Sequence, residues 1–182
     1  MSNNKDTTVK ALSVRSITSM ALLIALQVVF TRFLSITQWN MRIGFGFVPL
    51  VVAAVIFGPV RAAFVGGMSD FIGSMLIPTA TGPYNPGITL TNALMGLVFG
   101  LFLKKKLTTF RIIPAVAVNQ LVLSLLLNTY WISISRGSPF LGTLFPNRLI
   151  QCIINVPVQI VVISLIAKSA GAFLKKQADQ LN

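Results

Sequence analysis

The stretch MRIGFGFVPLVVAAVIFGPVRAAFVGGMSDFIGSMLIP, residues 41–78, contains two apolar runs separated by Gly58 and Pro59. Proline has no N–H for a helix hydrogen bond, so we expect a tight turn there. The expected helices on either side are residues 44–58 and 60–77. Their apolar residues form long runs rather than the one-sided stripe of a soluble helix. The stretch therefore predicts membrane helices.

The composition of the 182-residue chain indicates the same class, since 54% of its residues are hydrophobic and the mean hydropathy is +0.82. Crossing a hydrocarbon core of about 30 Å takes roughly 20 helical residues. We expect an all-α integral membrane protein, a single bundle of six transmembrane helices with both termini cytoplasmic. The expected helices are residues 14–36, 44–58, 60–77, 88–104, 111–136 and 146–174. They form one domain over residues 1–182, with short polar tails at 1–13 and 175–182.

The fifteen Lys and Arg residues predict the orientation of this bundle. Eleven of them fall on the side of the termini, including those of LKKKLTTFR at residues 103–111. Cytoplasmic loops are rich in Lys and Arg, so this side is assigned to the cytoplasm. The formal net charge of +12 does not indicate nucleic acid, because the cations interrupt apolar segments instead of covering a polar face.

The four cations on the outer side are all arginines. They are Arg32, Arg42, Arg136 and Arg148. A planar guanidinium matches a carboxylate in a bidentate fork better than an ammonium does. We therefore expect an anion-binding site at the outer surface. The alternative is that each arginine reaches the outer lipid headgroups.

The sequence offers little for catalysis. It has no His, three acidic residues (Asp6, Asp70 and Asp179) and one cysteine, Cys152. An intramembrane enzyme needs a base, a nucleophile or a metal cluster, so we expect no catalytic residue, metal or cofactor. The chain also lacks the G-x-x-x-x-G-K-[ST] phosphate loop, so a partner must hydrolyse any ATP that is used.

Polar and aromatic residues gather in the expected outer halves of the helices. Burying an ionised carboxylate alone is costly, so Asp70 should pair with an arginine or face a polar cavity. The other residues of this group are Tyr84, Asn85, Asn92, Asn128, Tyr130 and Trp131. Aromatic side chains at this level often form an interfacial belt, but amides beside aromatic faces also suit a flat heterocycle.

Small residues recur at a spacing of four, which lets helices approach closely. Ala21 and Ala25 have this spacing on the first expected helix. Gly96 and Gly100 have it on the fourth, and we expect these two to pack inside the bundle.

Residues 41–78, followed by GPYNPGITLTNALMGLVFGLFLKKK at 82–106, resemble the S components of energy-coupling factor (ECF) transporters, most closely the folate-specific ones. The resemblance extends over nearly the whole chain. It implies a substrate-binding, multi-pass subunit of the prokaryotic plasma membrane whose external loops close over a vitamin. It also implies a transmembrane coupling subunit and two ATPase subunits as partners. The docking motif A-x-x-x-A of the family matches Ala21 and Ala25.

The resemblance and the arginines together predict folate as the vitamin. Folate joins a pterin ring to a glutamate tail with two carboxylates, whereas thiamin is cationic and would be repelled. We expect Arg42 first, then Arg148, to bind the tail, with Arg32 and Arg136 as further candidates. The residues expected to hold the ring are Tyr84, Asn85, Asn92, Asn128 and Trp131. The alternatives are an S component for a pyridoxine-type or hydroxymethylpyrimidine-type vitamin, or a small membrane enzyme or structural subunit.

Overall fold

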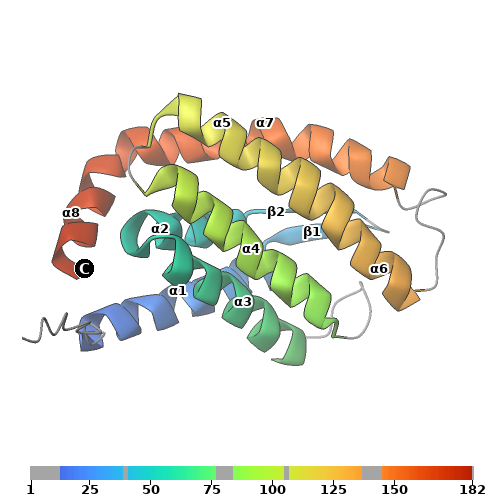
Figure 1. Ribbon diagram of the computed structural model, residues 1–182, viewed down its shortest axis with the longest axis horizontal. Coiled ribbons are helices and arrows are strands. Elements are labelled where there is room, and N and C mark those ends of the chain that lie inside the picture. The colour runs from blue at the N-terminus through green and yellow to red at the C-terminus, as the bar shows by residue number, and fades with distance from the viewer. Residues whose placement is uncertain (1–12, 39–40, 77–83, 105–106, 137–144, 182) are drawn as a thin grey trace, which may run out of the picture.

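The computed structural model describes residues 13–38, 41–76, 84–104, 107–136 and 145–181 (Figure 1). The elements of the first half are α1 (Val14–Arg32), β1 (Ser35–Gln38), β2 (Met41–Gly44), α2 (Phe47–Phe57), α3 (Pro59–Leu76) and α4 (Pro86–Leu103). Those of the second half are α5 (Thr109–Ala117), the π-helix η1 (Val118–Leu127), α6 (Asn128–Arg136), α7 (Phe145–Ser169) and α8 (Gly171–Leu181). Because α5, η1 and α6 follow one another without a break, they form one long helix.

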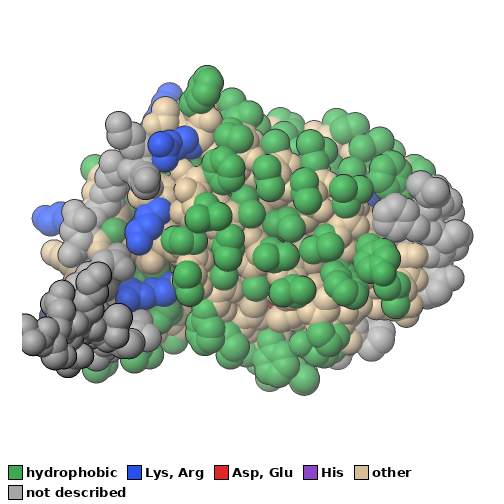
Figure 2. Space-filling view, in the orientation of Figure 1, with side chains coloured by type: hydrophobic (Ala, Val, Ile, Leu, Met, Phe, Trp, Pro, Cys, Tyr) green, Lys and Arg blue, Asp and Glu red, His purple; other side chains and the backbone are tan. Residues whose placement is uncertain are grey.

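The helices form a membrane bundle. Four helical segments are long and apolar enough to cross a bilayer: Val14–Arg32, Pro86–Leu103, Thr109–Ser135 and Arg148–Ser169. Figure 2 shows an apolar surface over the middle of the bundle, with the visible Lys and Arg side chains concentrated at the end where α8 lies. An apolar band beside a basic end is the pattern of a helical membrane protein. The prediction of a helical membrane protein is therefore confirmed.

Helix α2 forms the core of this bundle. It has eleven residues, which is about 16 Å of helix and far less than a hydrocarbon core needs. Its side chains are almost all buried, and Val51, Ala53 and Ala54 are 0% exposed. It contacts α1, α3, α4 and α8. A helix that is apolar on every side is stable when protein surrounds it, so the expected spanning helix at residues 44–58 is instead a short internal one.

The turn predicted between α2 and α3 is confirmed. Gly58 has φ 83°, a left-handed conformation that residues with a Cβ rarely adopt. Its N–H donates to the carbonyl of Ala54 at 3.1 Å and closes the last turn of α2. Pro59 then begins α3, where its missing N–H has no helical partner to lose.

Helices α3 and α4 pack closely through glycines, as the sequence predicts. A Cβ at Gly96 would collide with the carbonyl oxygen of Ala62, and one at Gly100 would collide with the backbone of Pro59. A Cβ at Gly66 would lie 2.5 Å from the carbonyl oxygen of Asn92. The backbones can come this close only because no side chain separates them.

The first and the last expected helices differ from those of the structure. The first does not reach residue 36, because α1 stops at Arg32 and residues Ser35–Gln38 pair with Met41–Gly44 in an antiparallel hairpin. The Ser35 hydroxyl donates to the Thr31 carbonyl at 2.6 Å, which satisfies an acceptor that the ending helix leaves open. The prediction of a purely helical fold is corrected to this extent. The last expected helix, 146–174, is divided into α7 and α8 at Ala170.

Candidate ligand-binding site

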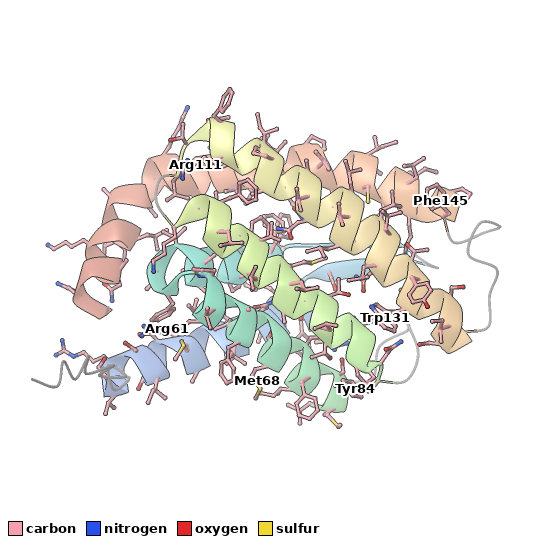
Figure 3. All side chains as sticks on the ribbon, in the orientation of Figure 1. Arg61, Met68, Tyr84, Arg111, Trp131 and Phe145 are labelled. Atoms are coloured by element: carbon pink, nitrogen blue, oxygen red, sulfur yellow. The ribbon has the colours of Figure 1, made fainter. Side chains whose placement is uncertain are left out.

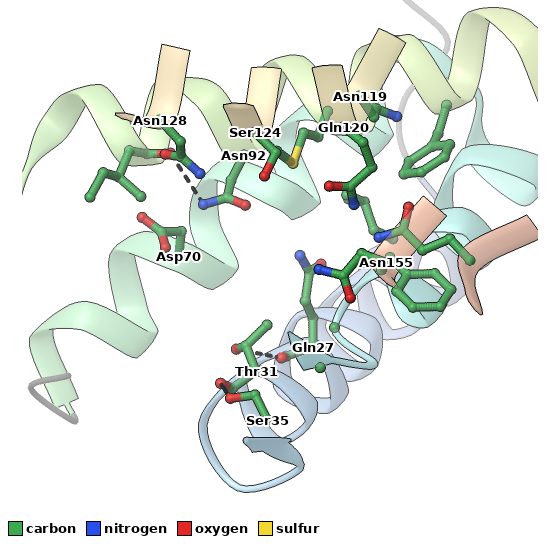
Figure 4. A pocket seen from close by; sticks show the side chains of 18 of the residues that line it. Gln27, Thr31, Ser35, Asp70, Asn92, Asn119, Gln120, Ser124, Asn128 and Asn155 are labelled. Atoms are coloured by element: carbon green, nitrogen blue, oxygen red, sulfur yellow. Dashed lines mark hydrogen bonds between the residues drawn. The ribbon is translucent and has the colours of Figure 1, made fainter. Parts of the chain in front are cut away.

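A cavity of about 170 Å³ lies between α1, α3, α4, η1 and α7 (Figure 4). A single water needs only roughly 10–15 Å³, so the cavity is large enough for a small molecule's ring. Its polar lining consists of Gln27, Thr31, Ser35, Asp70, Asn92, Asn119, Gln120, Ser124, Asn128, Gln151, Asn155 and Gln159. Apolar side chains, among them Phe47 and Phe99, complete the wall.

Helix α7 supplies one row of amides to this lining. Gln151, Asn155 and Gln159 are spaced four residues apart, so they share one face of the helix. All three are buried, in a segment whose other residues are mostly apolar. A buried amide is costly unless it hydrogen-bonds, so a row of three within an apolar segment indicates a face built for polar contacts.

The π-helix η1 brings a second polar row to the cavity. Asn119 and Asn128 are nine residues apart, which is about two and a half turns of an α-helix and would put them on opposite faces. The i→i+5 hydrogen bonds of a π-helix make each turn wider. Both amides, with Ser124 between them, consequently line the same cavity.

Several of the lining amides carry buried atoms without a hydrogen-bond partner in the described part of the chain. They are Gln27 Oε1, Asn119 Oδ1 and Nδ2, Asn128 Oδ1 and Gln159 Oε1. Leaving such an atom unpaired costs about 1–3 kcal/mol. The set includes both donors and acceptors, so it suits a ligand whose edge carries both kinds of group.

The structure brings three of the residues singled out in the sequence to this cavity. Asn92 and Asn128 line it, as does Asp70. Thr89 Oγ1 donates to Asp70 Oδ2 at 2.8 Å, and Arg32 interacts electrostatically with the same carboxylate. The expectation that Asp70 would pair with an arginine or face a polar cavity is met by the cavity.

The arginines take different positions. Arg148 is 7% exposed and precedes Gln151 by three residues, so it continues the polar face of α7 beyond the cavity lining. Arg32 is held against α3, because its Nη2 donates to Ser74 Oγ at 2.9 Å and its guanidinium lies beside Gly73. The backbone of Arg42 belongs to β2 and that of Arg136 ends α6, but their side chains lie outside the described residues.

The structure does not bring Tyr84, Asn85 and Trp131 to the described cavity lining. Asn85 caps α4, since its Oδ1 accepts from Gly87 N at 2.8 Å while its Nδ2 donates to Trp131 O at 3.1 Å. The Trp131 ring occupies the space over Gly87. Tyr84 contacts Phe71 edge to face at 5.6 Å. These residues join α4 to its neighbours at the end of the bundle opposite Arg61 and Arg111 (Figure 3).

Apart from Asn92, Asn128 and Asp70, the polar residues of the lining were not predicted from the sequence; they include Asn119 and Gln120 of η1, the amide row of α7, and Gln27. The signal that could have found the row of α7 is the repetition of Gln151, Asn155 and Gln159 at a spacing of four in a segment that is otherwise apolar. The aromatic and charged residues predicted from the sequence lie nearer the helix ends than these amides do.

A protein family described as the ECF-type riboflavin transporter S component matches residues 11–172 of the chain. The chain belongs to this S-component family. Its members are substrate-binding subunits of transporters rather than enzymes, and they are multi-pass membrane proteins. The resemblance stated from the sequence is confirmed.

Two curated relatives carry the name folate transporter FolT. The protein of Clostridium novyi is 39% identical over 145 residues, which are 79% of this chain and 83% of that protein. The protein of Leuconostoc mesenteroides is 27% identical over 156 residues, 82% of each chain. The S component is thus similar over most of its length to proteins with this name.

Solved structures agree in fold. A crystal structure of FolT bound with folic acid matches with a TM-score of 0.80 and 32% identity, over 85% of this chain and 93% of that one. The S component for biotin from an ECF-type transporter matches with a TM-score of 0.63 over 93% and 95% of the two chains. At 18% identity the second likeness shows the fold alone.

Proposed function

We propose that this S component is the high-affinity binding subunit of an ECF-type ABC importer that takes up folate. The observation that carries the proposal is the amide-lined cavity, with Arg148 three residues beyond Gln151 on the face of α7 that lines it. Amides with unpaired donors and acceptors suit the edge of a pterin ring, and a guanidinium suits the carboxylates of a glutamate tail. The likeness to FolT proteins supports the same vitamin.

The proposal includes a six-helix membrane bundle, in which α2 is the short internal helix, with both termini in the cytoplasm. Helices α1, α4, α5 to α6, and α7 are the long spans, while α2 and α3 complete the bundle. Figure 1 shows that α1 begins and α8 ends at the same end of the molecule, which is also where Arg61 and Arg111 lie in Figure 3. Concentration of cations there supports a cytoplasmic location.

Energy for transport comes from partners in this proposal. A transmembrane coupling subunit binds the S component, and two ATPase subunits hydrolyse ATP. Ala21 and Ala25 are exposed on α1, as is Leu22 between them. An exposed face of small and apolar residues supports close contact with a partner helix.

Riboflavin is the second candidate, because the matching family is described by that vitamin. To decide, the protein is purified in detergent, its bound small molecule is identified by mass spectrometry, and binding is measured by calorimetry. We expect folate to copurify, and folate to bind at least about 1.4 kcal/mol, or tenfold, more tightly than riboflavin, pyridoxine or hydroxymethylpyrimidine. Tighter binding of any of these other three would overturn the proposal.

A further inference from the structure

We propose that Asp70 makes the cavity selective for a 2-amino-4-oxopteridine ring over rings that carry oxygen instead of the 2-amino group. This inference rests on the proposed function, because it assigns recognition of the ring edge within the same site. It adds a specificity-determining residue and names the chemical class that this residue rejects.

Asp70 differs in charge from everything else that lines the cavity. It is the only acidic residue between positions 7 and 178 of the sequence, and the other polar lining residues are amides and hydroxyls. Figure 4 shows its carboxylate beside the amides of Asn92 and Asn128. A ligand ring bound beside these amides would lie in the same cavity as the Asp70 carboxylate.

The carboxylate has a hydrogen-bond partner on one neighbouring helix and a cation on another. Thr89 Oγ1, on α4, donates to Oδ2 at 2.8 Å. Arg32, on α1, interacts with it electrostatically and is itself held by Ser74 on α3 at 2.9 Å. The charge of Arg32 offsets part of the cost of burying Asp70. A carboxylate has about four lone-pair sites, so the contact with Thr89 is compatible with further hydrogen bonds.

The ring edge of a 2-amino-4-oxopteridine complements a carboxylate. Its N3–H and one 2-amino N–H are parallel donors, and the two carboxylate oxygens accept both in a bidentate pair. In a 2,4-dioxo ring, including the isoalloxazine of riboflavin, position 2 carries a carbonyl oxygen. That oxygen would face a carboxylate oxygen, so one hydrogen bond is replaced by repulsion. Sites built to pair a polar group reject analogues that lack it.

The test uses folic acid and its 2-deamino-2-oxo analogue, which have the same tail and differ at position 2 of the ring and in the hydrogen that the oxo form carries on N1. Affinities are measured by calorimetry on the full chain in detergent, for the wild type and Asp70→Asn. The wild type should bind folic acid roughly ten- to a hundredfold more tightly than the analogue. Asp70→Asn keeps the side-chain shape. It should weaken the binding of folic acid by a similar factor, but it should leave the binding of the analogue equal or tighter, because the new amide N–H can donate to the 2-oxo group.

The ratio of the two affinities separates recognition from a structural role. If Asp70 only balances the charge of Arg32, Asp70→Asn weakens the binding of both ligands equally. The ratio of their affinities is then unchanged, which overturns the inference. Thr89→Val keeps both charges but removes the hydrogen bond that orients the carboxylate, so it should lower the ratio severalfold. If Asp70→Asn does not fold, Thr89→Val is used in its place. An unchanged ratio of the two affinities in Thr89→Val then overturns the inference.

The wild-type measurements distinguish the two proposals. Tight binding of folic acid with equal affinity for the analogue would leave the proposed function intact and overturn the role of Asp70. Binding of riboflavin without binding of folic acid would overturn both.

Discussion

Of the two outer arginines whose side chains the structure describes, Arg148 is the one that we expect to contact a ligand's carboxylates. It is buried, and it lies one turn from Gln151 on the face of α7 that lines the cavity. A charge-assisted hydrogen bond from a guanidinium contributes about 1.5–3 kcal/mol. Arg148→Gln should therefore weaken folate binding by roughly ten- to a hundredfold, as measured by calorimetry. A pterin without the glutamate tail should lose little, because it lacks the carboxylates.

Arg111→Gln is the matched control for this substitution. Arg111 lies near the start of α5, at the other end of the bundle from Phe145 and the start of α7 (Figure 3). Arg111→Gln should leave the affinities for folate and for the tail-less pterin unchanged. Equal losses for folate and the tail-less pterin in Arg148→Gln would mean that this arginine supports the ring or the fold rather than the tail.

At the scale of elements, the contact between α3 and α4 makes the sharpest prediction. Gly96→Ala places a methyl group against the Ala62 carbonyl oxygen, and overpacking of this kind typically costs about 1–3 kcal/mol. We expect a lower free energy of unfolding in mixed-micelle denaturation, and a lower melting temperature. Gly67→Ala is the control on the same pair of helices, since its new Cβ would lie 3.4 Å from the Cβ of Ala93.

Gly67→Ala should be neutral or slightly stabilising, because alanine favours a helix over glycine by up to about 1 kcal/mol. If both variants unfold at the same denaturant concentration as the wild type, the close approach of the two backbones at Gly96 is not a source of stability.

For the whole molecule, the distribution of cations predicts its orientation in the membrane. Thr108 is exposed at the start of α5, and Tyr84 is exposed before α4. In a Cys152→Ser background, Thr108→Cys should react with a membrane-impermeant maleimide only after the membrane is opened. Tyr84→Cys should react in intact cells. The reverse pattern of labelling would contradict both the cytoplasmic termini and an external entrance to the cavity.

The sequence by itself determined the class of protein and the division into most of its helices. Long apolar runs favour the membrane because transferring them out of water is favourable, and Gly58 with Pro59 favours a turn because of local backbone geometry. Neither signal depends on distant residues. The motifs at residues 41–78 and 82–106 similarly sufficed to predict the family. Asn92 and Asn128 were predicted as part of the site because their residue type and level in the bundle agreed.

Only the tertiary structure decided which helices face lipid and which residues meet in the cavity. Hydropathy does not separate α2 from a spanning helix, because lipid and protein interior are both apolar, and its burial depends on the helices around it. Asn119 and Asn128 line the same cavity only because of the wider turn of η1, whereas an α-helical pattern puts them on opposite faces. The amide row of α7 likewise becomes one wall of the cavity only when α1, α3, α4 and η1 pack around it. Hydrogen-bonding groups far apart in the chain converge through packing, which local sequence patterns do not contain.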